Sequence, residues 1–86
     1  MAFEEELKAC VLERFDDAQF VEFGLVESMG KVGGMVTSTR FKGMPQLDRQ
    51  TELWTALKGR FSPDDLRHVS LILTLTPEEL EGLDED

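Results

Sequence analysis

Hydrophobic positions in the first half of the chain predict one helix followed by two strands. Apolar residues of the segment 3–15 recur on a single stripe at helical spacing, with acidic and basic residues outside it. Apolar and polar residues alternate in the segments 19–28 and 35–41, which is typical of strands. The stretch GKVGG, residues 30–34, is expected to be a flexible loop that joins the two strands as an antiparallel hairpin.

The second half predicts two further helices, a strand and a final helix. Residues 47–58 form a helical pattern, and the segment 62–65 reads as the cap and first turn of a short helix. The most apolar run, residues 68–75, is expected to be a buried strand because turn residues bound it on both sides. In the segment 76–79, a threonine, a proline at the first helical position and a glutamate compose a capping box that starts the last helix.

The order of these elements predicts an α+β fold, α-β-β-α-β-α. The third strand follows a helical crossover, so it can pair parallel to one strand of the hairpin and complete a three-stranded mixed sheet with helices packed on it. A length of 86 residues is enough for one modest core. We expect a single domain over residues 1–83 and an acidic tail over residues 84–86.

Composition and charge narrow the possible partners. The formal net charge is −9, and only the segment 31–67 has more bases than acids. The whole chain should repel a nucleic-acid backbone, so nucleic acid is disfavoured as a partner. The sequence contains no apolar run of the roughly 20 residues that span a bilayer, and the start of the chain does not look like a signal peptide. We expect no membrane partner and a cytoplasmic location, with an organelle reached through a removed presequence left open.

A set of catalytic side chains is missing from the pattern, so we expect a protein that is not an enzyme. Cys10 lies on the apolar stripe of the first helix, where a small buried hydrophobe is its expected role. As the one cysteine of the chain it forms no internal disulfide. The carboxylates occur as adjacent pairs, which do not face one point. The GxxG pattern that starts at Gly30 resembles a KH clamp but joins two strands rather than two helices, which favours a plain hairpin loop.

His68 is the residue with two open interpretations. It stands where a short helix passes into the buried strand, so its imidazole can lie at the end of the sheet with one nitrogen exposed. A structural histidine bonded within its own chain and a histidine that binds something outside the chain both fit this position.

Two segments, TRFKGMPQLDRQTELWTAL and HVSLILTLTPEELEGL, resemble the BolA-like protein family. TRFKGMPQLDRQTELWTAL, residues 39–57, is similar to the family's strand, loop and second helix. HVSLILTLTPEELEGL, residues 68–83, is similar to its third strand and the Thr-Pro-x-Glu that follows. The resemblance implies a fold like that of class II KH domains and a non-enzymatic adaptor. Such proteins bind monothiol glutaredoxins, can share a 2Fe–2S cluster with them, and act in iron–sulfur trafficking, iron regulation or stress response.

The resemblance also assigns residues. His68 falls on the family's cluster-ligating histidine, and an imidazole nitrogen can replace a thiolate on iron. Arg40, Phe41, Gly43 and Arg49 fall on the strand-loop-helix signature, where maintaining the fold is the alternative to meeting a partner. The candidate partner-binding residues are Arg40, Phe41, Lys42, Gly43, Arg49 and His68.

One departure from the family pattern concerns the second cluster ligand. Many members supply a histidine or cysteine from the loop between the first two strands, and SMGKVGG contains neither. We therefore expect a monomer without a cofactor when alone, and a shared cluster that is weakly held or a complex without one. The alternative function is a KH-like nucleic-acid-binding transcriptional regulator, which requires the bases of the segment 31–67 to converge on one face.

Overall fold

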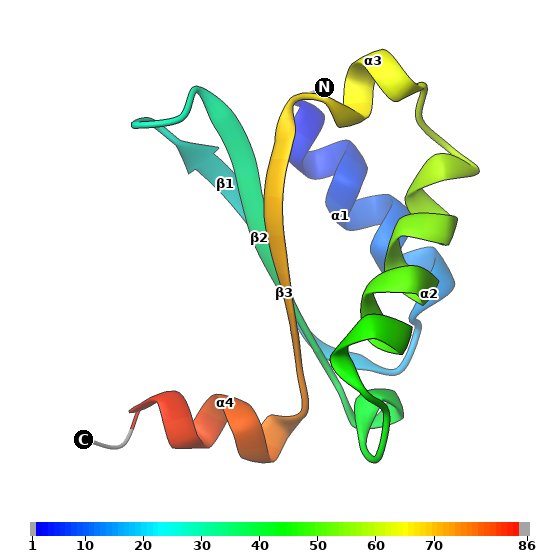
Figure 1. Cartoon of the computed structure of the whole chain (residues 1–86), viewed down its shortest axis with the longest axis vertical. Helices are drawn as coiled ribbons and strands as arrows, with labels where there is room; N and C mark the ends of the chain where they lie inside the picture. Colours follow the sequence, from blue (N-terminus) through cyan, green and yellow to red (C-terminus); the bar gives the residue numbers. More distant parts are fainter. Residues whose placement is uncertain (1, 85–86) are drawn as a thin grey trace.

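The structure, a computed structural model, describes residues 2–84 and has the predicted order of elements (Figure 1). The elements are α1 (Phe3–Arg14), β1 (Ala18–Val26), β2 (Lys31–Ser38), the 3-10 turn η1 (Thr39–Phe41), α2 (Gln46–Lys58), α3 (Pro63–Leu66), β3 (Val69–Leu75) and α4 (Pro77–Asp84). The sheet has the order β1-β2-β3, with β1 antiparallel and β3 parallel to β2. The prediction of an α+β fold with a three-stranded mixed sheet is confirmed.

The core lies between one face of the sheet and the helices α1 and α2 (Figure 1). The apolar stripe predicted for the first helix is the face that α1 buries. Cys10 is part of it and is buried, as expected. The fully buried side chains that form the centre of the core are Leu7, Val11, Phe15, Val36, Phe41, Leu53, Leu57 and Ile72.

The second strand of the hairpin begins earlier in the chain than the sequence indicated. β2 starts at Lys31, so the prediction of a flexible loop over residues 30–34 is wrong, and a turn at residues 27–30 joins the strands. Gly30 supplies a positive φ of 64° in that turn. Gly34 pairs with Phe23 across the hairpin, and a Cβ on Gly34 would collide with that ring. Glycine is therefore a packing requirement inside β2 rather than a sign of a loop.

The predicted second strand also ends too late. Residues 39–41 were expected to extend it, but they turn into η1, which the Ser38 side chain caps by accepting from the Arg40 amide at 3.1 Å. The turn places Phe41 in the core, where its ring centroid lies 5.7 Å from that of Phe15. The alternation of residues 35–41 assigned Phe41 to a strand face. In the structure Phe41 is buried from the turn η1 and not from a strand.

The predicted helix starts at Ser62 and Thr76 are confirmed; the capping box expected at Thr76 is present, and Ser62 forms one as well. The Asp65 amide donates to the Ser62 hydroxyl at 3.2 Å, and the Ser62 amide to the Asp65 carboxylate at 3.4 Å. The Thr76 amide donates to Glu79 at 2.8 Å, and the Glu79 amide to Thr76 at 3.2 Å. α4 continues through Asp84, the first residue of the predicted acidic tail, and residues 85–86 lie outside the described residues. Within residues 2–84 no helix combines the length and apolar composition required to cross a membrane.

Candidate functional site

His68 lies in the short connection between α3 and β3, and its backbone is held on both sides. Its amide donates to the Asp65 carbonyl at 3.1 Å, and its carbonyl accepts from the Val32 amide at 2.8 Å. The first bond closes α3, and the second starts the parallel pairing of β3 with β2. The imidazole itself is exposed and makes no hydrogen bond to any of residues 2–84. A fixed backbone with an unengaged ring suits a residue that binds something outside the chain.

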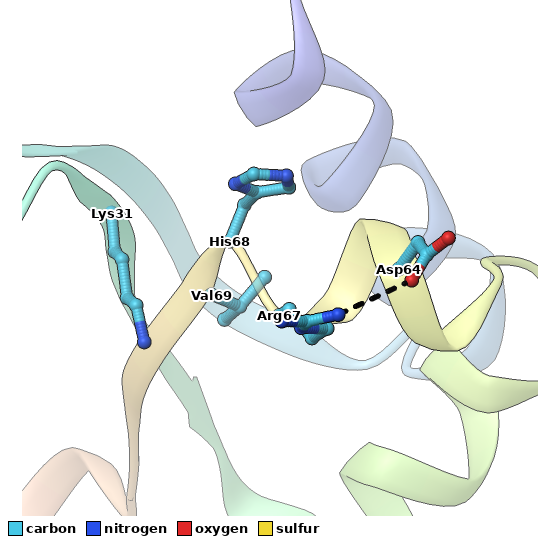
Figure 2. A pocket seen from close by; sticks show the side chains of 5 residues that line it. All are labelled: Lys31, Asp64, Arg67, His68 and Val69. Atoms are coloured by element: carbon cyan, nitrogen blue, oxygen red, sulfur yellow. Dashed lines mark ion pairs between the residues drawn. The ribbon is translucent and has the colours of Figure 1, made fainter.

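The ring stands over an open hollow of about 670 Å³ at this end of the sheet. Figure 2 shows the residues that line it and that the His68 ring points away from the Arg67 side chain. Arg67 pairs with Asp64 at 3.6 Å, and both of these side chains are largely exposed. The lining residues are Lys31, Asp64, Arg67, His68 and Val69. The hollow therefore has two bases and one acid on a chain of net charge −9, which makes it locally basic.

Lys31 is a member of this hollow that the sequence analysis did not select. It belongs to the segment taken as a loop, and nothing in its immediate neighbours marks it. The parallel register pairs Val32 with Val69, and this brings the preceding residues, Lys31 and His68, to the same end of the sheet. Lys31 could have been found from the sequence only if the register of β2 against β3 had been predicted.

The side chains described here could supply a metal cluster with one ligand at this place. Among residues 2–84 no three histidine, cysteine or acidic side chains gather in a way that could hold a metal ion. Cys10 lies at the seam of α1 and α2, where its thiol faces the Ala56 carbonyl at 3.7 Å, and it is not part of the hollow. Burial raises the pKa of the Cys10 thiol, with smaller effects from Arg60 and Glu13, so it stays protonated and is a poor ligand.

Arg49, expected among the residues that meet a partner, is instead a buried structural residue. Only 5% of it is exposed. Its guanidinium donates to the Met44 carbonyl at 2.9 Å, to the Thr74 carbonyl at 3.1 Å and to Glu79 at 2.7 Å. These bonds join the loop before α2, the end of β3 and the first turn of α4. The expectation of a direct partner contact is corrected because Arg49 is buried and each of its three guanidinium nitrogens already donates within the fold.

The other signature residues divide between the core and the surface. Phe41 is fully buried, so it also leaves the set of direct partner contacts. Gly43 has a positive φ of 79° in the turn before α2, which favours glycine for a backbone reason. Arg40 lies over the Phe15 ring and pairs with Asp17 at 3.8 Å and Glu52 at 3.4 Å. Lys42 is exposed and is the signature residue that is open to a partner among those described.

The bases of the middle segment do not converge on one face. Arg49 is buried at the start of α2, whereas Lys58 is the last residue of that helix. Arg60 pairs with Glu13 of α1, and Arg40 is neutralised by its two acidic neighbours. The GxxG pattern lies at the turn and start of β2 and connects no helices. Residues 2–84 therefore present no continuous basic surface of the kind that tracks a phosphate backbone.

Comparison with known proteins supports the fold. The chain is an α+β domain whose mixed sheet is covered by helices, and it is similar to a solved structure described as a Bol-like protein from Babesia bovis. The TM-score is 0.69 at 18% sequence identity, over 99% of this chain and 96% of that one. No family model and no curated protein matches the sequence. The chain therefore has the BolA-like fold, as the resemblance of its two segments implied.

Proposed function

We propose that this protein is a non-enzymatic adaptor that docks onto a monothiol glutaredoxin through the surface around His68. The proposal combines the BolA-like fold with one feature of the site, an exposed imidazole on a fixed backbone. Its expected setting is iron–sulfur trafficking, iron regulation or stress response in the cytoplasm. The alternative, a KH-like nucleic-acid binder, lacks the continuous basic surface that it requires.

The side chains at the hollow can provide one ligand for a shared 2Fe–2S cluster. Such a cluster is held by four ligands, and histidine can replace cysteine on one iron. In this chain His68 fits the role of a single ligand, because its ring is exposed and unengaged. The partner would then supply the remaining ligands. With one ligand from this side, docking should not depend strictly on the cluster.

The charge of the hollow supports the same kind of partner. Lys31 and Arg67 flank His68, and only Asp64 opposes them in the lining. Thiolates, carboxylates and an iron–sulfur cluster with thiolate ligands are all negatively charged or electron-rich. A locally basic hollow attracts such groups although the chain as a whole is acidic.

The first prediction concerns His68→Ala in a mixture with a monothiol glutaredoxin. We expect the native chain to change the visible absorption and circular dichroism of the glutaredoxin's cluster on forming a heterodimer, because an imidazole replaces another ligand. His68→Ala should lose that change. Its affinity for the cluster-free partner, measured by calorimetry, should weaken less than about tenfold, since one rim contact is removed from a larger interface.

The matched control is Gln19→Ala, which alters an exposed side chain on β1 away from the hollow. This variant should behave as the native chain in both measurements. A heterodimer spectrum identical to that of the glutaredoxin's own cluster dimer, and unaffected by His68→Ala, would remove His68 as a ligand. An absence of binding to both the cluster-free and the cluster-loaded partner would overturn the adaptor proposal itself.

A further inference from the structure

One face of the sheet remains largely uncovered. α1 and α2 lie on one side of the strands, whereas α4 leaves the end of β3 on the opposite side (Figure 1). α4 packs mainly against β2 and β3, and its Glu79 is bonded to Arg49 of α2, but within residues 2–84 it leaves large apolar side chains of this face exposed. Sheets with apolar residues on both faces normally carry elements on both. The uncovered part is therefore the place to look for an external partner.

Large apolar side chains are exposed on this face. Leu71 is 62% exposed, and Leu73 and Phe20 are each 40% exposed. Leu73 pairs with Met35 of β2, which is half-buried, so the apolar residues form one patch across all three strands. We call this set, Phe20, Met35, Leu71 and Leu73, the open-face patch. Contiguous exposed apolar area on a small protein marks an interaction site more often than isolated exposed residues do.

A hollow over β1 and β2 adjoins the patch and shares Phe20 and Met35 with it. Gly24 and Gly33 are paired across β1 and β2, and neither contributes a side chain. A Cβ added to Gly24 would meet nothing within 4 Å, so the space above it is open. The hollow has a volume of about 320 Å³ and is lined by Phe20, Glu22, Gly24, Gly33, Gly34 and Met35. It is large enough to receive apolar side chains from a docked segment.

The rim of this face is acidic, and this restricts the occupant. Glu22 lines the hollow, and Glu78 and Glu81 are exposed on α4, the helix that borders the face. Among the described residues of the strands and α4, Lys31 at the far end of β2 is the one base. A second copy of this chain would bring acidic groups against acidic groups. Electrostatic complementarity therefore favours a basic partner.

The outer edge of the sheet, at β3, does not accept a partner by strand addition, the other common mode of docking. The carbonyl of Ile72 accepts from Gln50 at 2.8 Å, and that of Thr74 accepts from Gln46 at 3.0 Å. Two acceptors of the outer edge are thus occupied by side chains of α2, so an added strand finds them blocked. A partner has to lie on the face rather than along this edge. Helices already cover the opposite face of the same sheet.

We propose that the open-face patch binds a basic amphipathic helix of a partner protein. The apolar stripe of the helix, at i, i+3, i+4 and i+7, would lie on Leu71, Leu73 and Phe20 and fill the hollow over the glycine pair. Lysine or arginine residues beside that stripe would face Glu22, Glu78 and Glu81. This surface is separate from the hollow at His68, so the proposal does not depend on the glutaredoxin partner.

The test uses a synthetic amphipathic peptide of about 18 residues, long enough to form helix on a surface, with a leucine stripe flanked by lysines. A second peptide carries glutamates in place of the lysines. Fluorescence anisotropy of each labelled peptide with the full chain measures binding. We expect the lysine peptide to bind, with affinity falling as salt rises, and the glutamate peptide not to bind.

Two pairs of matched variants locate the binding. Leu71→Ser with Leu73→Ser should weaken the lysine peptide by about tenfold or more, as loss of central apolar anchors does. Leu12→Ser with Leu47→Ser changes two exposed leucines elsewhere and should have little effect. Glu78→Gln with Glu81→Gln should weaken binding by roughly threefold, more than Glu5→Gln with Glu6→Gln, which removes the same charge from α1. Far-ultraviolet circular dichroism confirms that each variant is folded.

Several results would overturn the proposal. Equal effects of the two glutamate pairs, together with no effect of the patch variant, would mean that the peptide follows net charge alone. Equal binding of the glutamate peptide would exclude a basic partner. Sedimentation that shows a dimer of this chain, abolished by Leu71→Ser with Leu73→Ser, would mean that a second copy covers the face instead.

Discussion

At the scale of single residues, Arg49 shows how one side chain can connect three separate segments. It reaches the loop before α2, the end of β3 and the first turn of α4. The Thr74 carbonyl that it bonds also accepts from Gln46, so this part of the sheet edge is closed by two α2 side chains. α4 depends on this group because Glu79 provides both its cap and its ion pair. The attachment of the last helix is therefore electrostatic as much as apolar.

This attachment makes a pH-dependent prediction. Hydrogen bonds from Arg49 lower the pKa of the Glu79 carboxyl, with a further contribution from the Thr76 amide. Because the folded pKa is below the unfolded value of about 4.3, the stabilisation is complete above that pH and is lost as pH falls through the folded pKa. Glu79→Gln should lower the free energy of unfolding by roughly 1 kcal/mol at pH 7, since the pair is partly solvent-screened. The difference from the native chain should vanish in acid.

Glu78→Gln is the matched control, because Glu78 is an exposed glutamate next to the test position. In the test variant, glutamine at position 79 still provides a capping acceptor, so the variant removes the charge and keeps the cap. Urea unfolding of the three proteins between neutral and strongly acidic pH gives the comparison. A gap between native chain and Glu79→Gln that stays constant down to acid pH would contradict the role of the charge.

At the scale of elements, the two strands of the hairpin use glycine for different reasons. Gly34 faces the core side, and the Phe23 ring of the partner strand occupies the space where its Cβ would stand; the Glu22 carbonyl lies 2.8 Å from the same point. Gly24 faces the uncovered side and has open space above it. The first glycine is required for packing, and the second keeps the hollow of the open-face patch empty.

The corresponding prediction compares Gly34→Ala with Gly24→Ala. Gly34→Ala should lower the free energy of unfolding by roughly 1–3 kcal/mol, because backbone and ring both have to move. Gly24→Ala, the control on the partner strand, should change it by no more than about 0.5 kcal/mol. Thermal and urea denaturation measure both values. Equal stability of the two variants would show that the hairpin adapts to a side chain at position 34.

At the scale of the whole molecule, charge separates the two proposed surfaces. The hollow at His68 has two bases with one acid, and the open-face patch has an acidic rim. A protein of net charge −9 can thus attract an anionic partner at one place and a cationic partner at another. The two hollows share no lining residue: the first lies at α3 and the start of β3, and the second lies over β1 and β2.

The same charge distribution predicts weak binding to nucleic acid. Non-specific binding to duplex DNA depends on cationic contacts and typically has a Kd of roughly 10⁻⁴–10⁻⁶ M at physiological salt. With its bases dispersed and its arginines in ion pairs, this chain should bind a labelled duplex more weakly than about 10⁻⁴ M, and lowering the salt should not restore tight binding. Anisotropy titrations at two salt concentrations test this. Micromolar binding that falls steeply with salt would support the nucleic-acid-binding alternative.

Local patterns in the sequence account for most of the secondary structure. The capping boxes at Ser62 and Thr76 and the stripe of α1 were predictable because each depends on residues within one or two turns of helix. The hairpin limits were not, since the glycines of β2 are explained by the Phe23 ring of another strand. The exposure of His68 was one of two interpretations left open, because burial depends on how α3 and β3 are placed around it.

The sequence by itself determined the order of the elements, the acidic charge and the identity of the one histidine, since these depend on neighbouring residues or on composition alone. Tertiary structure decided which side chains share a surface. Only the parallel register of β2 and β3 brings Lys31 beside His68, and only the packing of α2 turns Arg49 inward. Likewise, only the placement of α4 leaves Leu71 and Leu73 uncovered. Such contacts join residues far apart in the chain, and no local pattern encodes them.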